Sequence, residues 1–70
     1  MLGKIIYKIR SEAKLTQEQF SKIFGVSQQS VQKWESGVAT PDLEKIVMIS
    51  KYFDVSLDAL ILGNDNRVVD

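Results

Sequence analysis

Three glutamines and one lysine between residues 28 and 33 are the side chains best suited to specific chemistry. Successive residues of an α-helix are about 100° apart around its axis, so one face of a helix here carries Gln28, Gln29, Gln32 and Lys33. The opposite face carries Val31 and Trp34. Glutamine amides can pair with adenine N6 and N7, and lysine with guanine O6 and N7 or with phosphate. We hypothesise that this carboxylate-free face reads base edges; the alternative is an ordinary solvated face, the usual origin of a polar stripe.

The flanking sequence predicts two short helices that position this face, over about residues 17–24 and 27–36. Thr16 and Gln19 form a capping box, in which side chain and backbone satisfy each other's unpaired groups at the helix start. Ser27 can cap the second helix, and Gly25 tolerates the left-handed backbone that the intervening turn needs. Two short helices across such a turn form a helix-turn-helix, which favours base reading over a merely solvated face.

The composition argues against catalysis and metal binding. The 70 residues suffice for one domain, and they include no cysteine and no histidine. Disulfides, the usual zinc sites and the commonest general base are therefore missing. We expect no enzyme, no metal, no cofactor and no small-molecule substrate. Because no apolar run approaches membrane-spanning length and no signal-peptide cleavage site is visible, we also expect a cytoplasmic protein with no membrane partner.

Charge is distributed unevenly along a chain that is neutral overall, with nine basic and nine acidic residues. A DNA-binding domain is expected to be basic, so this neutrality is an argument against that class. Residues 1–14, however, contain four basic residues and one acidic residue, a local charge of +3. Residues 42–70 contain three basic and six acidic residues, a local charge of −3. One positive face can suffice for DNA, and the overall balance predicts modest non-specific affinity.

Three further helices complete the predicted fold, an all-α compact bundle of five short helices in which the second and third form the helix-turn-helix. Apolar spacing predicts the first helix over about residues 2–13, and Lys14 stands where a helix-ending glycine would be less strained. Thr40 as a cap and Pro41 at the first helical position predict the start of the fourth helix. A fifth, capped by Ser56, covers about residues 57–62 and ends at Gly63.

The predicted domain covers residues 1–63, and residues 64–70 form a short polar tail or linker stub. Apolar positions on the inner faces of the five helices predict one shared core. Its members are Leu2, Ile6, Ile9, Phe20, Phe24, Val26, Val31, Trp34, Leu43, Ile46, Ile49, Phe53, Val55, Leu57 and Leu60.

The chain resembles the lambda-repressor/Cro-like helix-turn-helix family. The matching positions cover Leu2 to Gly63 and include Leu15-Thr16-Gln17, Phe20-Ser21, Phe24-Gly25-Val26-Ser27, Val31, Trp34-Glu35, Gly37, Pro41, Leu43 and Val55-Ser56-Leu57-Asp58. The chain departs from the family at Ser21, where alanine is usual, and at Ile23, where a polar residue is usual and exposure is expected. Ser27-Gln28-Gln29-Ser30 looks most like certain phage repressors that read DNA through paired glutamines.

The resemblance implies roles for further residues. Arg10 is expected to pair with Glu35; the alternatives are a solvent charge or a phosphate contact. Gln17 is expected to contact the DNA backbone, although it is equally a good first-turn residue. The other expected backbone contacts are Thr16, Ser27, Ser30 and Gly37. Family members often place a lysine or arginine in the loop after the third helix, and residues 36–40 contain neither.

The predicted function is sequence-specific binding of double-stranded DNA and transcriptional regulation, with repression as the default because it needs only occupancy. One recognition helix reads few base pairs, so we expect a homodimer, at least on DNA, on a pseudo-palindromic operator. Its contact is expected over Leu57–Leu62. The alternative is a protein-interaction module on the same fold, such as an antitoxin or adaptor, which neutral charge favours and the lack of an apolar patch on the recognition face disfavours.

Overall fold

Five α-helices and no strand make up residues 2–62, the part of the chain that the computed structural model describes. In chain order they are α1 (Leu2–Glu12), α2 (Gln17–Phe24), α3 (Gln28–Ser36), α4 (Leu43–Phe53) and α5 (Leu57–Leu62). The predicted all-α bundle is confirmed. The predicted tail over residues 64–70 and the end of the last helix at Gly63 lie outside the described residues.

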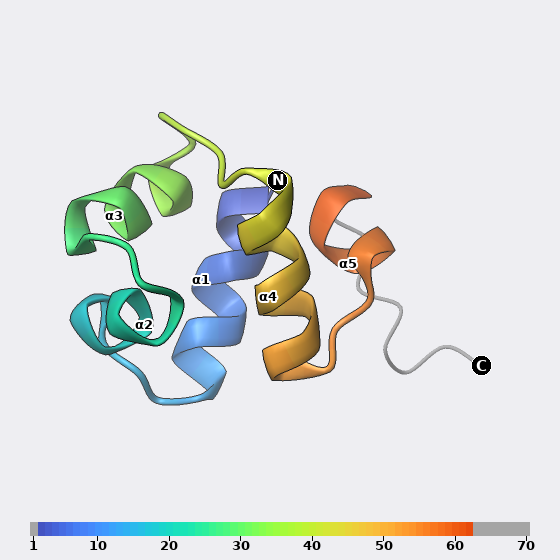
Figure 1. The fold of residues 1–70 in the computed structure, drawn as a ribbon, viewed down its shortest axis with the longest axis horizontal. Helices are drawn as coiled ribbons and strands as arrows, with labels where there is room; N and C mark the ends of the chain where they lie inside the picture. Colours follow the sequence, from blue (N-terminus) through green and yellow to red (C-terminus); the bar gives the residue numbers. More distant parts are fainter. Residues whose placement is uncertain (1, 63–70) are drawn as a thin grey trace.

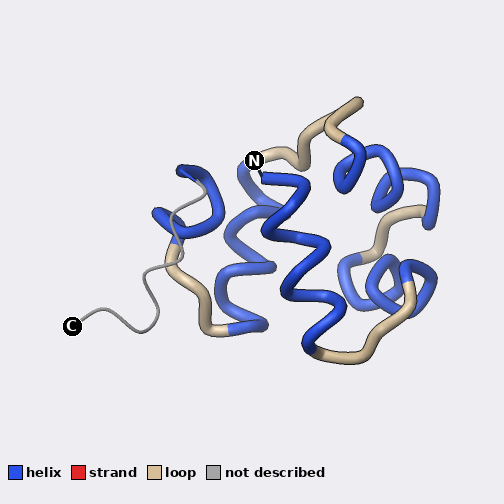
Figure 2. The backbone as a smooth tube through the Cα atoms, turned by 180° about the vertical axis from the view of Figure 1, so that it is seen from behind, coloured by secondary structure: helices blue, strands red, loops and turns tan. Residues whose placement is uncertain are grey.

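α1 runs through the middle of the molecule, with α2 and α3 on one side and α4 and α5 on the other (Figure 1). The view from behind shows the same order of helices (Figure 2). α1 contacts both α3 and α5, and α2 contacts α4, so the two pairs of helices share one core. α3 therefore has one side against the bundle and one side at the edge of the molecule.

Local capping groups start and end the helices of the helix-turn-helix. Thr16 Oγ1 accepts from the N–H of Gln19 at 3.0 Å, and the N–H of Thr16 donates to Gln19 Oε1 at 2.8 Å, which confirms the predicted capping box. Ser27 caps α3 by accepting from the N–H of Ser30. Gly25 has a φ of 68°, the left-handed conformation that glycine adopts without strain. The turn between the helices is therefore encoded within a few residues.

The start of α4 differs from the prediction by two residues. Asp42, rather than Thr40, is the capping residue, since its carboxylate accepts from the N–H of Lys45 at 3.0 Å. Pro41 is buried and precedes the helix instead of occupying its first position. Aspartate is a stronger helix cap than threonine, so the helix begins after Asp42 and not after Thr40.

Buried side chains from all five helices form the core. Of the predicted members, those that are buried or packed against it are Leu2, Ile6, Ile9, Phe20, Phe24, Val26, Val31, Trp34, Ile46, Ile49, Phe53, Val55 and Leu60. The prediction is wrong for Leu43 and Leu57, which are 67% and 40% exposed. Both begin a helix, and Leu43 lies about 120° around α4 from the buried Ile49. Ala59, which the prediction omits, is buried instead.

Candidate nucleic-acid interface

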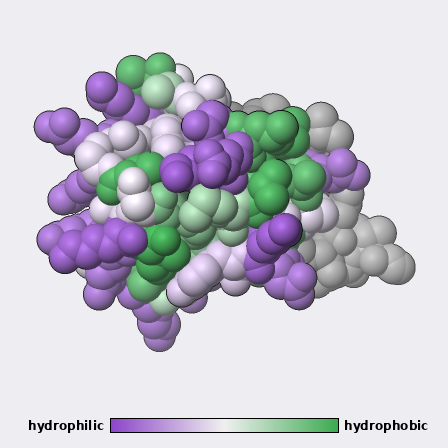
Figure 3. All heavy atoms as spheres, viewed as in Figure 1, coloured by the Kyte–Doolittle hydropathy of each residue, from purple (hydrophilic) through white to green (hydrophobic). Residues whose placement is uncertain are grey.

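α3 presents its polar face to solvent at the edge of the molecule, where Figure 3 shows mainly hydrophilic atoms. Val31 and Trp34 are buried, whereas the predicted base-reading residues are all exposed: Gln28, Gln29, Gln32 and Lys33. Within residues 2–62, none of these four side chains has a hydrogen bond or an ion pair. Their amide and ammonium groups are therefore available to a ligand.

Two hydroxyl groups lie beside these glutamines in the first turn of α3. Ser27 Oγ accepts from the N–H of Ser30 at 3.0 Å and also lies 3.0 Å from Ser30 Oγ. One of the two hydroxyl protons forms the hydrogen bond between the two oxygen atoms, and the other hydroxyl can donate outward. Both residues were expected to contact the DNA backbone, and the geometry leaves one O–H group that can donate to a phosphate oxygen.

Gly3, which the sequence analysis passed over, lets α1 and the end of α3 approach closely. It is buried, and a Cβ atom on it would lie 2.7 Å from the carbonyl oxygen of Glu35 and closer still to that of Trp34. Real Cβ atoms do not come this near to backbone oxygens, so only glycine fits here without a shift of one helix. A glycine inside a predicted amphipathic helix was the available signal.

A charged pair connects the same two helices further along α1. Arg10 Nε donates to Glu35 Oε2 at 2.6 Å, and Arg10 Nη2 donates to Glu35 Oε1 at 3.2 Å. Nη1 of the same guanidinium donates to the carbonyl oxygen of Leu15 at 2.8 Å. The side chains of Arg10 and Glu35 are only 13% and 8% exposed. The hydrogen bond to Glu35 raises the pKa of Arg10 above its usual value, against the opposing effect of burial. The expected internal pair is therefore present, and Arg10 is neither a solvent charge nor a free phosphate ligand.

Gln17 joins this charged pair. Its amide Nε2 donates to Glu35 Oε1 at 3.0 Å, and its side chain is half-buried. One of its two amide hydrogens thus points into the protein, so its link between the start of α2 and the end of α3 is structural. The remaining N–H is the only part of this amide that can donate to a phosphate group.

The N-terminus of α2 has mixed electrostatics. Thr16 is exposed, and its hydroxyl oxygen accepts from Gln19 while its O–H group can still donate outward. The helix dipole favours an anion here, but the carboxylate of Glu18 in the first turn opposes one. Lys22 Nζ lies 3.5 Å from that carboxylate and partly offsets its charge, although both side chains are exposed. A phosphate group near Thr16 is therefore compatible with, but not strongly favoured by, this turn.

The loop after α3 uses its first backbone N–H groups internally. Gly37 has a φ of 85°, and its N–H donates to the carbonyl oxygen of Trp34 at 3.3 Å. The N–H groups of Val38 and Ala39 both donate to the carbonyl oxygen of Lys33, at 3.0 and 3.2 Å. Gly37 is thus at the end of α3, as expected, but its N–H already has a partner. Its contribution to a phosphate contact would have to come from the shape of the loop.

A shallow hollow of about 440 Å³ follows the outer face of α3. Its lining includes three of the four predicted base-reading residues and continues into the loop after the helix: Gln29, Gln32, Lys33, Ser36 and Val38. A side chain from the loop therefore shares one surface with the polar face of the helix. We call this surface, together with Gln28, the recognition surface.

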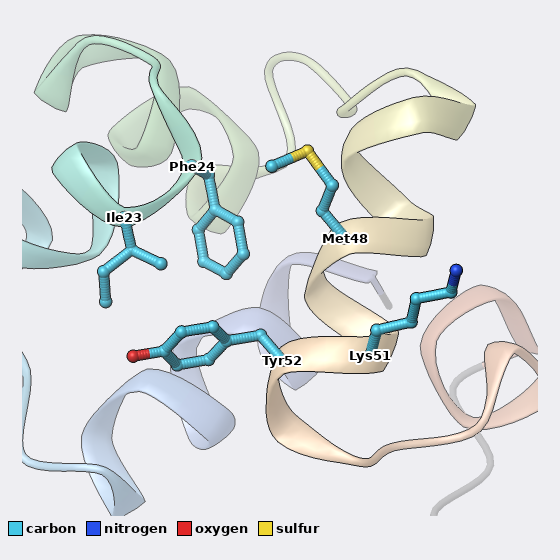
Figure 4. Close-up of a pocket in the computed structure, with 5 residues that line it drawn as sticks. All are labelled: Ile23, Phe24, Met48, Lys51 and Tyr52. Atoms are coloured by element: carbon cyan, nitrogen blue, oxygen red, sulfur yellow. The ribbon is translucent and has the colours of Figure 1, made fainter.

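A second hollow, of about 390 Å³, lies between α2 and α4 and is mainly apolar (Figure 4). The rings of Phe24 and Tyr52 meet edge to face beside it, with centroids 5.6 Å apart. Ile23 and Met48 complete its apolar lining, while the ammonium group of Lys51 points away. Ile23 packs against the core here, which contradicts its expected exposure. This hollow contains no cluster of converging polar groups.

Other kinds of site receive no support from the described residues. Residues 2–62 contain no group of three or more acidic, histidine or cysteine side chains that could hold a metal ion. Among the same residues, no helix is long and apolar enough to cross a membrane.

The exposed polar helix, held against the bundle and preceded by a second capped helix, defines a helix-turn-helix protein. A family model described as helix-turn-helix matches residues 6–60. The chain belongs to the Cro/cI-type helix-turn-helix family of DNA-binding transcription regulators, which are not enzymes.

Three relatives of this chain are two transcriptional regulators and an antitoxin. The chain is 38% identical over 60 residues to the HTH-type transcriptional activator BcrR of Enterococcus faecalis, covering 86% of this chain and 29% of that protein. It is 33% identical over 69 residues to the uncharacterized HTH-type transcriptional regulator YqaE of Bacillus subtilis, covering 99% and 60%. It is 38% identical over 68 residues to the antitoxin PezA of Streptococcus pneumoniae, covering 97% and 42%. The chain thus spans less than two thirds of the length of each of these relatives.

A solved structure matches nearly the whole fold. It is the crystal structure of the P22 c2 repressor protein in complex with a synthetic operator. The TM-score is 0.84 at 30% sequence identity, and the match covers 91% of this chain and 97% of that chain. The five-helix arrangement of α1 to α5 is therefore the fold of a repressor whose structure contains its operator.

Proposed function

We propose that this chain binds duplex DNA sequence-specifically, with α3 in the major groove, and represses transcription through occupancy of its site. The observation that carries the proposal is the recognition surface itself. Apart from Ser36, whose hydroxyl donates to the carbonyl oxygen of Lys33, it consists of exposed side chains without hydrogen-bond or ion-pair partners in residues 2–62. They lie along a helix whose other side is fixed to α1. The major groove is wide enough to admit an α-helix, and the amides and ammonium group match base edges there.

Within this proposal the residues divide into two groups. Those that read bases are Gln28, Gln29, Gln32 and Lys33. Those near the DNA backbone are Thr16, Gln17, Ser27, Ser30 and Gly37. Thr16 retains its O–H donor, and Ser27 and Ser30 together retain one. Gln17 and Gly37 contribute mainly by positioning. The amide of Gln17 already donates to Glu35, and the backbone N–H of Gly37 already donates to the carbonyl oxygen of Trp34.

We propose a homodimer on a pseudo-palindromic operator. Leu57 and Ile61 are both exposed and lie one turn apart on α5, so they share a face. Figure 3 shows hydrophobic atoms over α4 and α5, away from the recognition surface. Two such faces in contact would leave both copies of α3 free to read half-sites about one turn of DNA apart. The Leu57→Glu variant should lose cooperative binding to a two-half-site operator while binding one half-site normally; equal cooperativity would exclude this contact.

A second candidate is a module that binds a protein, such as an antitoxin. It is favoured by the formal net charge of zero and by the likeness to the antitoxin PezA. It is disfavoured by the recognition surface, whose side chains end in polar groups except for that of Val38.

The experiment that separates the two candidates is a titration with random-sequence duplex at low salt, followed by selection from a random duplex pool. We expect weak binding in the titration and an enriched, dyad-symmetric sequence from the selection. An absence of binding at the lowest salt would favour the protein-binding module instead.

A further inference from the structure

Val38 is the most exposed large apolar side chain of those that the structure describes, at 74%. A single exposed apolar residue is ordinary on a protein surface, so exposure alone indicates nothing. Its surroundings are unusual, however, because it lines the same hollow as Gln29, Gln32 and Lys33. Figure 3 shows hydrophobic atoms at the protruding end of the loop after α3, next to hydrophilic ones.

The loop is held firmly enough to fix the position of this side chain. The N–H of Val38 donates to the carbonyl oxygen of Lys33 at 3.0 Å, and the N–H of Ala39 donates to the same oxygen at 3.2 Å. Valine branches at Cβ and keeps few χ1 rotamers. Its two methyl groups therefore have a defined place beside the recognition helix.

The major groove contains one kind of apolar group, the C5-methyl of thymine, and proteins contact it with apolar side chains. The other side chains that line this hollow end in an amide, an ammonium or a hydroxyl group, so Val38 is the one that ends in methyl groups. We propose that Val38 contacts the methyl group of a thymine and so determines specificity at one position beyond those read by the start of α3. This inference rests on the proposed function, because it requires α3 to enter the major groove.

The separation along the helix predicts where this thymine lies. The seven residues from Gln29 to Ser36, the end of α3, correspond to about 10 Å along the helix axis, against 3.4 Å per base pair along DNA, and Val38 lies beyond that end. The thymine should therefore lie several base pairs from the bases that Gln28 and Gln29 contact.

The test is a thymine-to-deoxyuridine scan of the selected operator, which removes one methyl group at a time and leaves base pairing intact. Wild-type protein should lose affinity about fourfold at one such position in each half-site, the effect of one lost methyl contact. Val38→Ala should lose a similar factor on the thymine operator and show no further loss with deoxyuridine. Leu43→Ala, which removes an exposed apolar side chain from α4, is the control and should retain the full methyl dependence.

Three other results would contradict the inference. The first is a wild-type protein that binds the operator with no methyl-dependent position outside the Gln28 and Gln29 contacts. Val38→Ala could retain the wild-type dependence, which would assign the methyl contact to another residue. An equal loss by Val38→Ala on every sequence would assign Val38 to the sugar-phosphate backbone. Each of these requires a protein that binds DNA, whereas a protein that binds no duplex at all would contradict the proposed function itself.

Discussion

The two sides of α3 differ in whether their groups are bonded to, or packed against, the rest of the protein. On the inner side, Glu35 accepts from Arg10 and Gln17, and the backbone meets Gly3 at a distance that only glycine permits. On the outer side, four polar side chains have no partner within residues 2–62. A change on the inner side leaves a buried charge unpaired or makes a clash, whereas a change on the outer side alters little that holds the fold. If the outer side reads bases as proposed, stability and base specificity can be changed separately in one nine-residue helix.

The largest loss of stability should come from Arg10→Ala. It removes both guanidinium bonds to Glu35 and leaves a nearly buried carboxylate with only the amide of Gln17. Breaking a pair this well buried is expected to cost about 3 kcal/mol of unfolding free energy. Urea denaturation would measure the loss, with Lys4→Ala, an exposed lysine of the same helix, as the control. Similar midpoints for the two variants would show that the pair contributes no more than a surface charge.

Gly3→Ala should cause the next largest loss of stability, although helix propensity alone predicts a gain. Alanine is favoured over glycine in a helix by about 1 kcal/mol, so propensity alone predicts a more stable protein. The new Cβ would collide with the carbonyl oxygens of Trp34 and Glu35, and overpacking of this kind costs about 1–3 kcal/mol. Thermal unfolding should therefore show a lower midpoint. A raised midpoint would mean that α1 and α3 can separate without cost.

Lys33→Ala tests the outer side and should leave stability unchanged. If Lys33 holds phosphate, affinity should fall on all sequences alike, and the slope of log affinity against log salt should shrink by about 0.9. If it reads guanine, one position of the selected site should lose its preference. Binding measured at several salt concentrations distinguishes these roles. A lowered unfolding midpoint would contradict the separation of the two sides.

The smallest effect should come from Lys14→Gly, which changes neither side of α3. Lys14 lies in the turn that follows α1 and has a φ of 60°, a backbone conformation that glycine adopts at lower cost. We expect a gain of about 0.5 kcal/mol in unfolding free energy, with unchanged DNA affinity. A destabilised variant would show that the lysine side chain makes a contact worth more than the backbone strain.

Features that depend on neighbouring residues in the chain were predictable from the sequence. The capping box of Thr16 and Gln19, the cap at Ser27 and the left-handed Gly25 follow from backbone chemistry within a few residues, and the structure contains all three. Helical periodicity predicted the outward positions of Gln28, Gln29, Gln32 and Lys33. The pairing of Arg10 with Glu35 came from the family resemblance, because nothing local connects residues so far apart.

Features that depend on how helices pack were not predictable in the same way. Leu43 and Leu57 have the right side chains for a core, but each begins a helix and faces outward. Gly3 and Ala59 are buried because small residues suit helix contacts, and a search for large apolar side chains overlooks them. The inward amide of Gln17 depends on the orientation of α2 relative to α3, which no spacing within either helix specifies.

The most direct test of the central claim is parallel selection from a random duplex pool with the wild-type chain, Gln28→Ala, Gln29→Ala and Lys33→Ala. A glutamine amide on adenine contributes about 1–3 kcal/mol of discrimination. Each glutamine variant should therefore lose preference at one position per half-site while keeping weak general binding and a wild-type unfolding midpoint. Sites and affinities unchanged in all three variants would show that the outer face of α3 does not meet the bases.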